Sequence, residues 1–226
     1  MEIVGLNKVI DALGNAFSVF DFSFFISGAV TLGFIALDLH YYGHDGILQL
    51  QGWVSVLIYI LAIYVCGLMS WSVGKLMRWG ILRLIWGKEG IRNDFEKVYN
   101  DTQNSSTNGQ QDATQVTTGN ESYRVSYTKM WIEIEKKPEL ASKLSSLNKM
   151  WVMVAVFEGL ACSWMVGILV YLDGWLVGGW LINDSILLKL APLLVLIVMI
   201  AVCLHRATCY SRDLIKDVVT TYNNLD

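Results

Sequence analysis

The sequence predicts an all-α, polytopic membrane protein with four transmembrane helices, both termini in the cytoplasm and helical cytosolic extensions. Hydrophobic residues make up 54% of the chain and charged residues only 16%, which is far from the composition of a soluble domain. Several uncharged runs are long enough to cross a bilayer, which takes about 20 residues of helix. The basic residues avoid the short loops that join these runs in pairs.

The N-terminal residues 1–16 are expected to form an amphipathic helix at the membrane interface. Glu2, Lys8 and Asp11 stand among apolar residues there, the pattern of a helix that lies in the headgroup region. The segment lacks a positively charged start and an A-x-A cleavage site, so it does not read as a signal peptide and is expected to be retained.

The first transmembrane hairpin is predicted over residues 17–74. Its first span is centred on Phe22–Leu37, which carries no charge between Asp21 and Asp38. Its second span is predicted at Trp53–Trp71, because tryptophans at both ends suit the two headgroup regions.

Residues 75–149 are predicted to be a cytosolic helical region. Basic residues alternate with Leu, Ile and Trp after Gly74, as in a helix that leaves the membrane along its surface. Residues 100–122 consist almost wholly of small polar residues and are predicted to be a disordered linker. A helix that starts at Tyr123 should stop at Pro138, and the helix after it should run unbroken into the third span.

The second transmembrane hairpin is predicted over residues 150–204. Its third span, Met150–Leu172, is the longest apolar run with a single carboxylate inside it, and its fourth span is predicted at Ser185–Leu204. Residues 205–226 alternate charged and apolar positions, which predicts an amphipathic C-terminal helix in the cytoplasm.

The basic residues set the predicted orientation. Of 17 Lys and Arg residues, twelve lie between Lys75 and Lys149, and the loops after the first and third spans contain none. Since cytoplasmic loops carry the excess of Lys and Arg, both termini and the middle region should be cytoplasmic. The net charge of −3 does not suggest a direct nucleic-acid partner, because such domains usually show a basic excess.

Glu158 and its neighbours mark the third span as a packing centre. A charge near the middle of a span costs at least about 2.5–3.5 kcal/mol, so Glu158 should face protein or water, or be protonated. It could line an ion path, relay protons, pair with a basic residue, or serve as a buried packing acid. Gly159, Ser163 and Gly167 recur every four residues and form a stripe on which another helix can approach closely, a candidate surface for self-association.

Three further ionisable residues are pore candidates beside Glu158. Asp21 lies at the start of the first span and Lys189 near the predicted outer end of the fourth. Lys189 is expected to extend toward the headgroups or to pair with an outer aspartate. Arg206 follows the fourth span and could pair with Glu158.

No metal, cofactor or catalytic group is predicted. The outer cluster Asp38, His40, His44 and Asp45 has two histidines four residues apart, but that spacing suits a metal only on a helix, and an interfacial loop is expected here. The four cysteines lie in spans or at their inner ends and are expected to act as small packing residues. The chain carries no phosphate-binding glycine loop, H-E-x-x-H or paired C-x-x-C, so it is not expected to be an enzyme.

Three function classes follow. The favoured one is an oligomeric bacterial inner-membrane protein that couples a cytosolic partner or signal to the bilayer, with a permeability change as its output. The alternatives are a membrane anchor or scaffold without conductance, and a small ion channel or transporter that uses Glu158. In its plan of spans and cytosolic helices, rather than in any motif, the chain resembles small multi-span proteins of bacterial anti-phage systems, which implies a defence role and a soluble partner.

Overall fold

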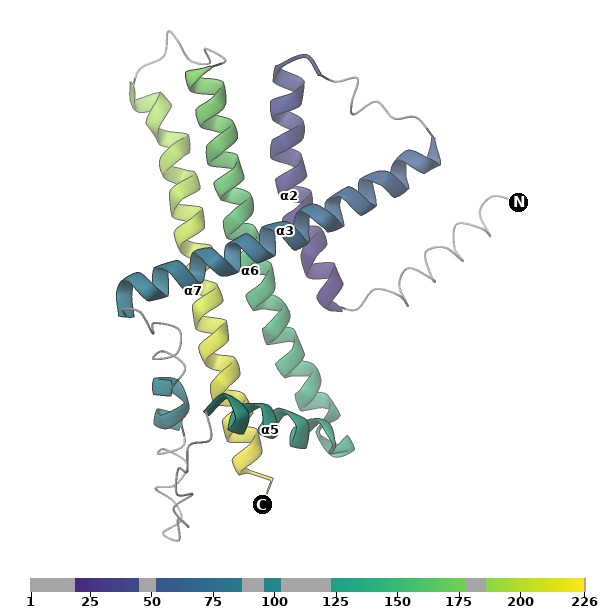
Figure 1. Ribbon diagram of the computed structural model, residues 1–226, viewed down its shortest axis with the longest axis vertical. Helices are drawn as coiled ribbons and strands as arrows, with labels where there is room; N and C mark the ends of the chain where they lie inside the picture. Colours follow the sequence, from purple (N-terminus) through teal and green to yellow (C-terminus); the bar gives the residue numbers. More distant parts are fainter. Residues whose placement is uncertain (1–18, 45–51, 87–95, 103–122, 178–185, 226) are drawn as a thin grey trace, which may run out of the picture. The chain divides into compact units, whose positions relative to one another are not determined.

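The structure, a computed structural model, describes residues 19–44, 52–86, 96–102, 123–177 and 186–225. This part of the chain is helical and contains no strand (Figure 1). Its elements are α2 (Val19–Tyr41), α3 (Trp53–Trp86), α5 (Tyr123–Glu135), η2 (Pro138–Leu140), α6 (Ala141–Leu176) and α7 (Ile186–Asn223). The interfacial helix expected at residues 1–16 lies outside the described residues.

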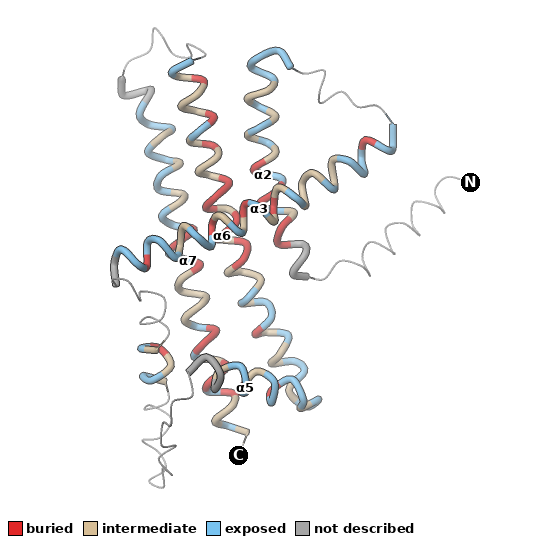
Figure 2. Tube along the Cα trace, viewed as in Figure 1, coloured by how far each residue is buried: buried red, intermediate tan, exposed pale blue. Residues whose placement is uncertain are grey.

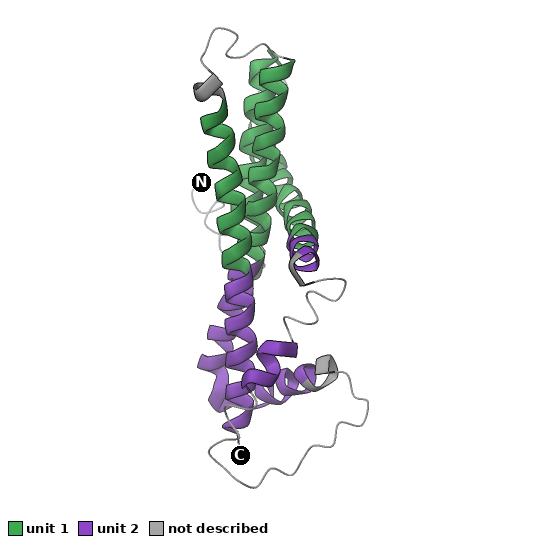
Figure 3. Ribbon diagram, turned by 90° about the vertical axis from the view of Figure 1, so that its left-hand side faces the viewer, with its two compact units in different colours: residues 1–77, 155–207 green, residues 78–154, 208–226 purple. Residues whose placement is uncertain are grey.

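Among the described residues, four helices, α2, α3, α6 and α7, are long and apolar enough to cross a membrane. The chain is therefore a multi-pass membrane protein by the length and composition of its helices. The described residues fall into two compact units (Figure 3), residues 1–77 with 155–207 and residues 78–154 with 208–226.

Three long helices each join a predicted span to a predicted helical extension. α3 starts at Trp53 as predicted and continues through Gly74 to Trp86, in keeping with the helix expected to leave the membrane after Gly74. α6 runs unbroken from Ala141 into the third span, as predicted. α7 has no break at residue 204, so the fourth span and the C-terminal helix are one helix. Residues 100–102, assigned to the linker, belong to a helical segment at residues 96–102, and the rest of the predicted linker is outside the described residues.

In the first unit, α2, α6 and α7 lie side by side and α3 crosses one face of this layer (Figure 1). α6 is the central helix, because 50% of the residues in its most apolar 18-residue stretch are buried. The corresponding share is 28% for α2 and 17% for α3 and α7. Burial concentrates where α3 crosses α2 and α6 (Figure 2). α3 exposes large apolar side chains along most of its length, and α7 exposes them between Leu190 and Val202.

Two glycines bring α2 and α3 into backbone contact. A Cβ added at Gly28 of α2 would meet the carbonyl of Ile63, and one added at Gly67 of α3 would meet the carbonyl of Phe24. Small residues allow helix backbones to approach this closely in membranes. The contact sits partway along both helices, which explains why α3 crosses α2 instead of following it.

A small hydrophobic cluster joins α6 to α7 in the first unit. Ala161 of α6 and Cys203 and Leu204 of α7 are buried together, with Trp164 and Ile200 packed against them. Small residues at the centre and larger ones around them let the two helices pack closely.

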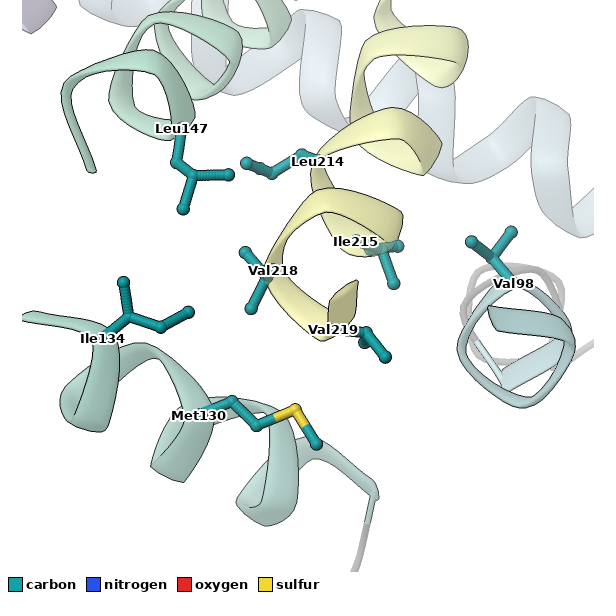
Figure 4. Packing of buried hydrophobic residues seen from close by; sticks show 8 residues of the cluster. All are labelled: Val98, Met130, Ile134, Leu147, Leu214, Ile215, Val218 and Val219. Carbon is teal, nitrogen blue, oxygen red and sulfur yellow. The ribbon is translucent and has the colours of Figure 1, made fainter. Parts of the chain in front are cut away.

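The second unit has a hydrophobic core of its own (Figure 4). The end of α7 supplies four of its buried residues, Leu214, Ile215, Val218 and Val219, and α5, α6 and the 96–102 segment supply the other four, Val98, Met130, Ile134 and Leu147. The Nζ atom of Lys143 lies 3.1 Å from Oδ2 of Asp217, so an ion pair also joins α6 to α7 here. Because both side chains of this pair are partly exposed, the core and not the ion pair accounts for most of the stability of this unit.

α2 ends in a glycine turn. Gly43 has a φ of +71°, the amide of Gly43 donates to the carbonyl of His40, and the amide of His44 donates to the carbonyl of Leu39. These two bonds form a Schellman motif, in which glycine adopts the left-handed conformation that ends a helix. The turn fixes the neighbouring residue Tyr42 at the end of α2.

Candidate functional site: a buried polar centre at the crossing of α2, α3 and α6

Glu158 is buried where α6 meets α3. Its side chain is only 2% exposed, and its Oε2 atom accepts a hydrogen bond of 2.9 Å from the indole Nε1 of Trp71. The Trp71 ring also packs against Phe24 of α2, with 5.5 Å between ring centroids. The carboxyl group thus lies in a protein-lined site rather than against lipid, in keeping with the cost of exposing a charge to hydrocarbon.

Gly74 makes the approach of α3 to Glu158 possible. It lies one helical turn after Trp71, and a Cβ at this position would meet the backbone carbonyl of Glu158. The two helices therefore touch through backbone at Gly74 and through a side-chain hydrogen bond at Trp71. This pairing fixes α3 against α6 at the level of the carboxyl group.

Hydroxyl groups from all three helices form a second part of the polar centre. Thr31 of α2 donates to Oγ of Ser163 on α6 at 2.9 Å, and its Oγ1 atom lies 2.8 Å from Oγ of Ser70 on α3. Because the single proton of Thr31 goes to Ser163, Ser70 is the donor in the contact with Thr31. One hydroxyl of α2 thus links α3 to α6.

Ser163 completes the network on the α6 side. Its Oγ atom lies 2.9 Å from the carbonyl of Ser27 and 3.0 Å from the carbonyl of Gly159, and these two acceptors share its proton. The side chain is fully buried. Buried hydroxyls that find partners in this way hold the helices in one register, because any slippage would leave them unsatisfied.

The predicted small-residue stripe on α6 faces α2 of the same chain. A Cβ at Gly159 would meet the side chain of Ser27, and one at Gly167 would meet the ring of Phe34. Together with Ser163, the whole stripe is buried within the first unit. A second copy of the chain would therefore have to associate through another surface.

Of the other pore candidates, the structure describes only the side chain of Arg206. It lies exposed on α7, and Glu158 accepts a hydrogen bond from Trp71. Asp21 lies in the first turn of α2 and Lys189 in the first turn of α7, but their side chains are outside the described residues.

The outer histidines and acids show no metal site in the part of the chain that is described. No group of three or more His, Cys, Asp or Glu residues there could hold a metal, and Asp45 lies outside it. Instead, the hydroxyl of Tyr42 donates to Oδ2 of Asp173 at 2.5 Å and joins the end of α2 to α6. This hydrogen bond raises the pKa of Tyr42 to about 12, with smaller contributions from burial and from the charges of Asp173 and Asp38.

Sequence reasoning did not identify four residues of the polar centre: Ser27, Thr31, Ser70 and Trp71. A signal for two of them was present, because Ser23, Ser27 and Thr31 recur every four residues along an apolar span, which places hydroxyls on one face of a helix. Trp71 was assigned to the aromatic belt, since a tryptophan near the end of a span suits the headgroup region equally well.

Comparisons of the chain with protein-family models, with curated proteins and with solved structures found no match. Any functional assignment must therefore be argued from the geometry of the two units.

Proposed function

We propose that this chain is an oligomeric inner-membrane protein of bacteria that couples a cytosolic partner or signal to the bilayer. One observation carries the proposal: α6 and α7 each contribute, as single unbroken helices, to both compact units. A force applied to the second unit can travel along a continuous helix, because the helical backbone is rigid over such lengths.

The second unit suits the role of receiving element. It has its own buried core, and its outer surface carries exposed charged side chains such as Glu133, Glu135 and Lys136. A polar, charged surface supports docking of a soluble protein through complementary charges. We place this unit in the cytoplasm because it contains most of the basic residues of the chain.

The polar centre suits the role of responding element. α6 carries both Glu158 and Ser163, so a shift of α6 along its axis would strain the bonds to Trp71 and Thr31 together. Packed interfaces of this kind have discrete arrangements and do not deform smoothly. Movement of α6 would therefore convert a cytosolic event into a rearrangement of α2 and α3 within the membrane.

The exposed apolar faces of α3 and α7 suit association between copies of the chain. Large apolar side chains stand exposed on both helices, including Trp53, Leu61 and Met69 on α3 and Leu194 on α7. A permeability change would arise between subunits, because the polar centre of one subunit is buried within its own first unit.

The test is membrane potential in bacteria that express the chain alone or with its genomic neighbours. We expect depolarisation from the wild-type chain, loss of depolarisation in Glu158→Gln, and no loss in the matched control Glu133→Gln, which changes an exposed carboxylate on α5. Membrane levels of the three proteins must be equal.

The absence of depolarisation under both conditions would refute the permeability output and favour a membrane anchor. That second candidate is supported by the closed packing around Glu158, whose side chain is buried and hydrogen-bonded. Orientation is tested separately with an impermeant thiol reagent in a cysteine-free background. His44→Cys should react with the reagent from outside the cell, and Lys136→Cys should not. Both positions are exposed in the structure, so a lack of reaction reports the side of the membrane and not burial.

A further inference from the structure

A pocket of about 330 Å³ opens in the first unit between α2, α6 and α7. Phe34 and Leu37 of α2, Val170 and Tyr171 of α6, and Val195 and Leu196 of α7 line it. Its size falls at the lower end of the range for ligand pockets, about 300–1,000 Å³. The lining side chains are apolar or aromatic, and all three helices are long and apolar enough to cross a membrane, so the pocket suits a lipid acyl chain.

Two lining residues explain why side chains do not fill this space. Gly167 of α6 has no side chain to project into it, and the ring of Phe34 packs directly over that glycine. Pro192 lies inside α7, where proline cannot form the usual backbone hydrogen bond and tends to bend a helix. The pocket is therefore bordered by a side-chain-free position on α6 and by a proline on α7.

An acidic pair stands at one end of the pocket. Asp38 comes four residues after the lining residue Phe34, and Asp173 three residues after Val170, spacings that put each aspartate on the same helix face as the lining residue and about 4.5–6 Å further along. Tyr42 lies beside both, because its backbone amide donates to the carbonyl of Asp38 and its hydroxyl donates to Oδ2 of Asp173. The Oδ1 atom of Asp38 is buried and accepts no hydrogen bond from the described residues.

We propose that this pocket binds one acyl chain of a bilayer phospholipid whose headgroup carries a primary ammonium, and that Asp38 and Asp173 hold the ammonium. An acyl chain matches an apolar pocket among membrane-spanning helices, and an ammonium matches two carboxylates, one of which has a buried oxygen that lacks a hydrogen-bond partner among the described residues. An anionic headgroup would be repelled by the pair. A choline headgroup has no N–H to donate to Asp38. This inference uses the first unit alone and does not depend on the proposed function.

The test is lipid titration of the detergent-solubilised full chain by native mass spectrometry. The probes are phosphatidylethanolamine, phosphatidylcholine and phosphatidylglycerol with identical acyl chains. We expect phosphatidylethanolamine to bind most tightly, with one high-affinity molecule per chain. Asp38→Asn should weaken that binding about tenfold, the equivalent of one charge-assisted hydrogen bond, and should leave phosphatidylglycerol binding no weaker than before.

A second pair of variants tests the pocket. Val195 is 57% exposed and Val202 is 47% exposed, and both lie on α7, but only Val195 lines the pocket. Val195→Phe should reduce the occupancy of the high-affinity site and Val202→Phe should not, with helix content unchanged in both. Equal binding of the three lipids, or equal effects of the two phenylalanine variants, would overturn the proposal.

Discussion

The hydrogen bond between Trp71 and Glu158 can be tested by replacing the donor while keeping an aromatic ring. Trp71→Phe removes the indole N–H that reaches Oε2 of Glu158 at 2.9 Å and retains a ring beside Phe24. Hydrogen bonds between membrane helices contribute about 0.6 kcal/mol on average and up to about 1.7. A carboxylate acceptor strengthens the bond roughly twofold, so we expect a loss of about 1–2 kcal/mol in unfolding free energy.

A double-mutant cycle with Glu158→Gln isolates this bond from changes in packing. Glutamine keeps an oxygen that accepts from Trp71 but loses any negative charge, so the single variant should cost less than Trp71→Phe. In the glutamine background Trp71→Phe should cost about half as much as in the wild type, because a neutral acceptor makes the weaker bond. The measurement is reversible unfolding in mixed micelles, followed by helical circular dichroism.

The matched control for this cycle is Trp53→Phe on the same helix. Trp53 is 73% exposed, so the same substitution there should change stability by no more than a few tenths of a kcal/mol. Equal losses of stability from Trp71→Phe and Trp53→Phe, or strict additivity of the Trp71→Phe and Glu158→Gln effects, would show that the hydrogen bond does not stabilise the packing of α3 against α6.

Three further predictions concern the packing of the two units. Gly28→Ala should lower stability by about 1–3 kcal/mol, because its Cβ would meet the carbonyl of Ile63. The control Gly33→Ala on the same helix meets no atom and should stabilise the protein by up to about 1 kcal/mol. Equal effects of the two substitutions in thermal unfolding would refute the α2–α3 contact. Ser163→Leu should separate α2 from α6 and lower the unfolding midpoint, and an unchanged midpoint would contradict the burial of Ser163. Burial raises the pKa of Tyr127 to about 12, above its usual value near 10. The stability that the neutral tyrosine contributes is therefore complete below about pH 10 and is lost as the pH rises to about 12. Tyr127→Phe should resist alkaline unfolding in that pH window, measured by circular dichroism.

The helices could be located from the sequence because an apolar run must lie against protein or against lipid hydrocarbon along its whole length. Trp53 and Pro138 marked a helix start and a helix stop correctly. The sequence divides α3 and α7 each into a span and a helical extension, at Gly74 and at residue 204, whereas each is one continuous helix in the structure, because no residue at either point breaks a helix. A change from apolar to amphipathic pattern marks a change of surroundings, and the backbone continues through it.

The polar centre could be predicted only in part. Glu158 stood out because a carboxylate inside an apolar run is costly, and the small residues beside it indicated a close helix contact. Which helix made that contact depends on side chains that meet across more than a hundred residues of sequence, such as Ser163 with Ser27. Such pairing follows from tertiary packing, which leaves no local pattern in a single sequence.

The unbroken course of α7 has a consequence for how the chain can vary. Cys203 and Ala207 are buried in the first unit, and Leu214 and Val218 in the second, and their spacings of four, seven and four residues keep them on one side of the helix. Adding or removing one residue between Ala207 and Leu214 would turn one set by about 100° relative to the other. Homologous chains should therefore differ in this stretch by substitution and keep its length.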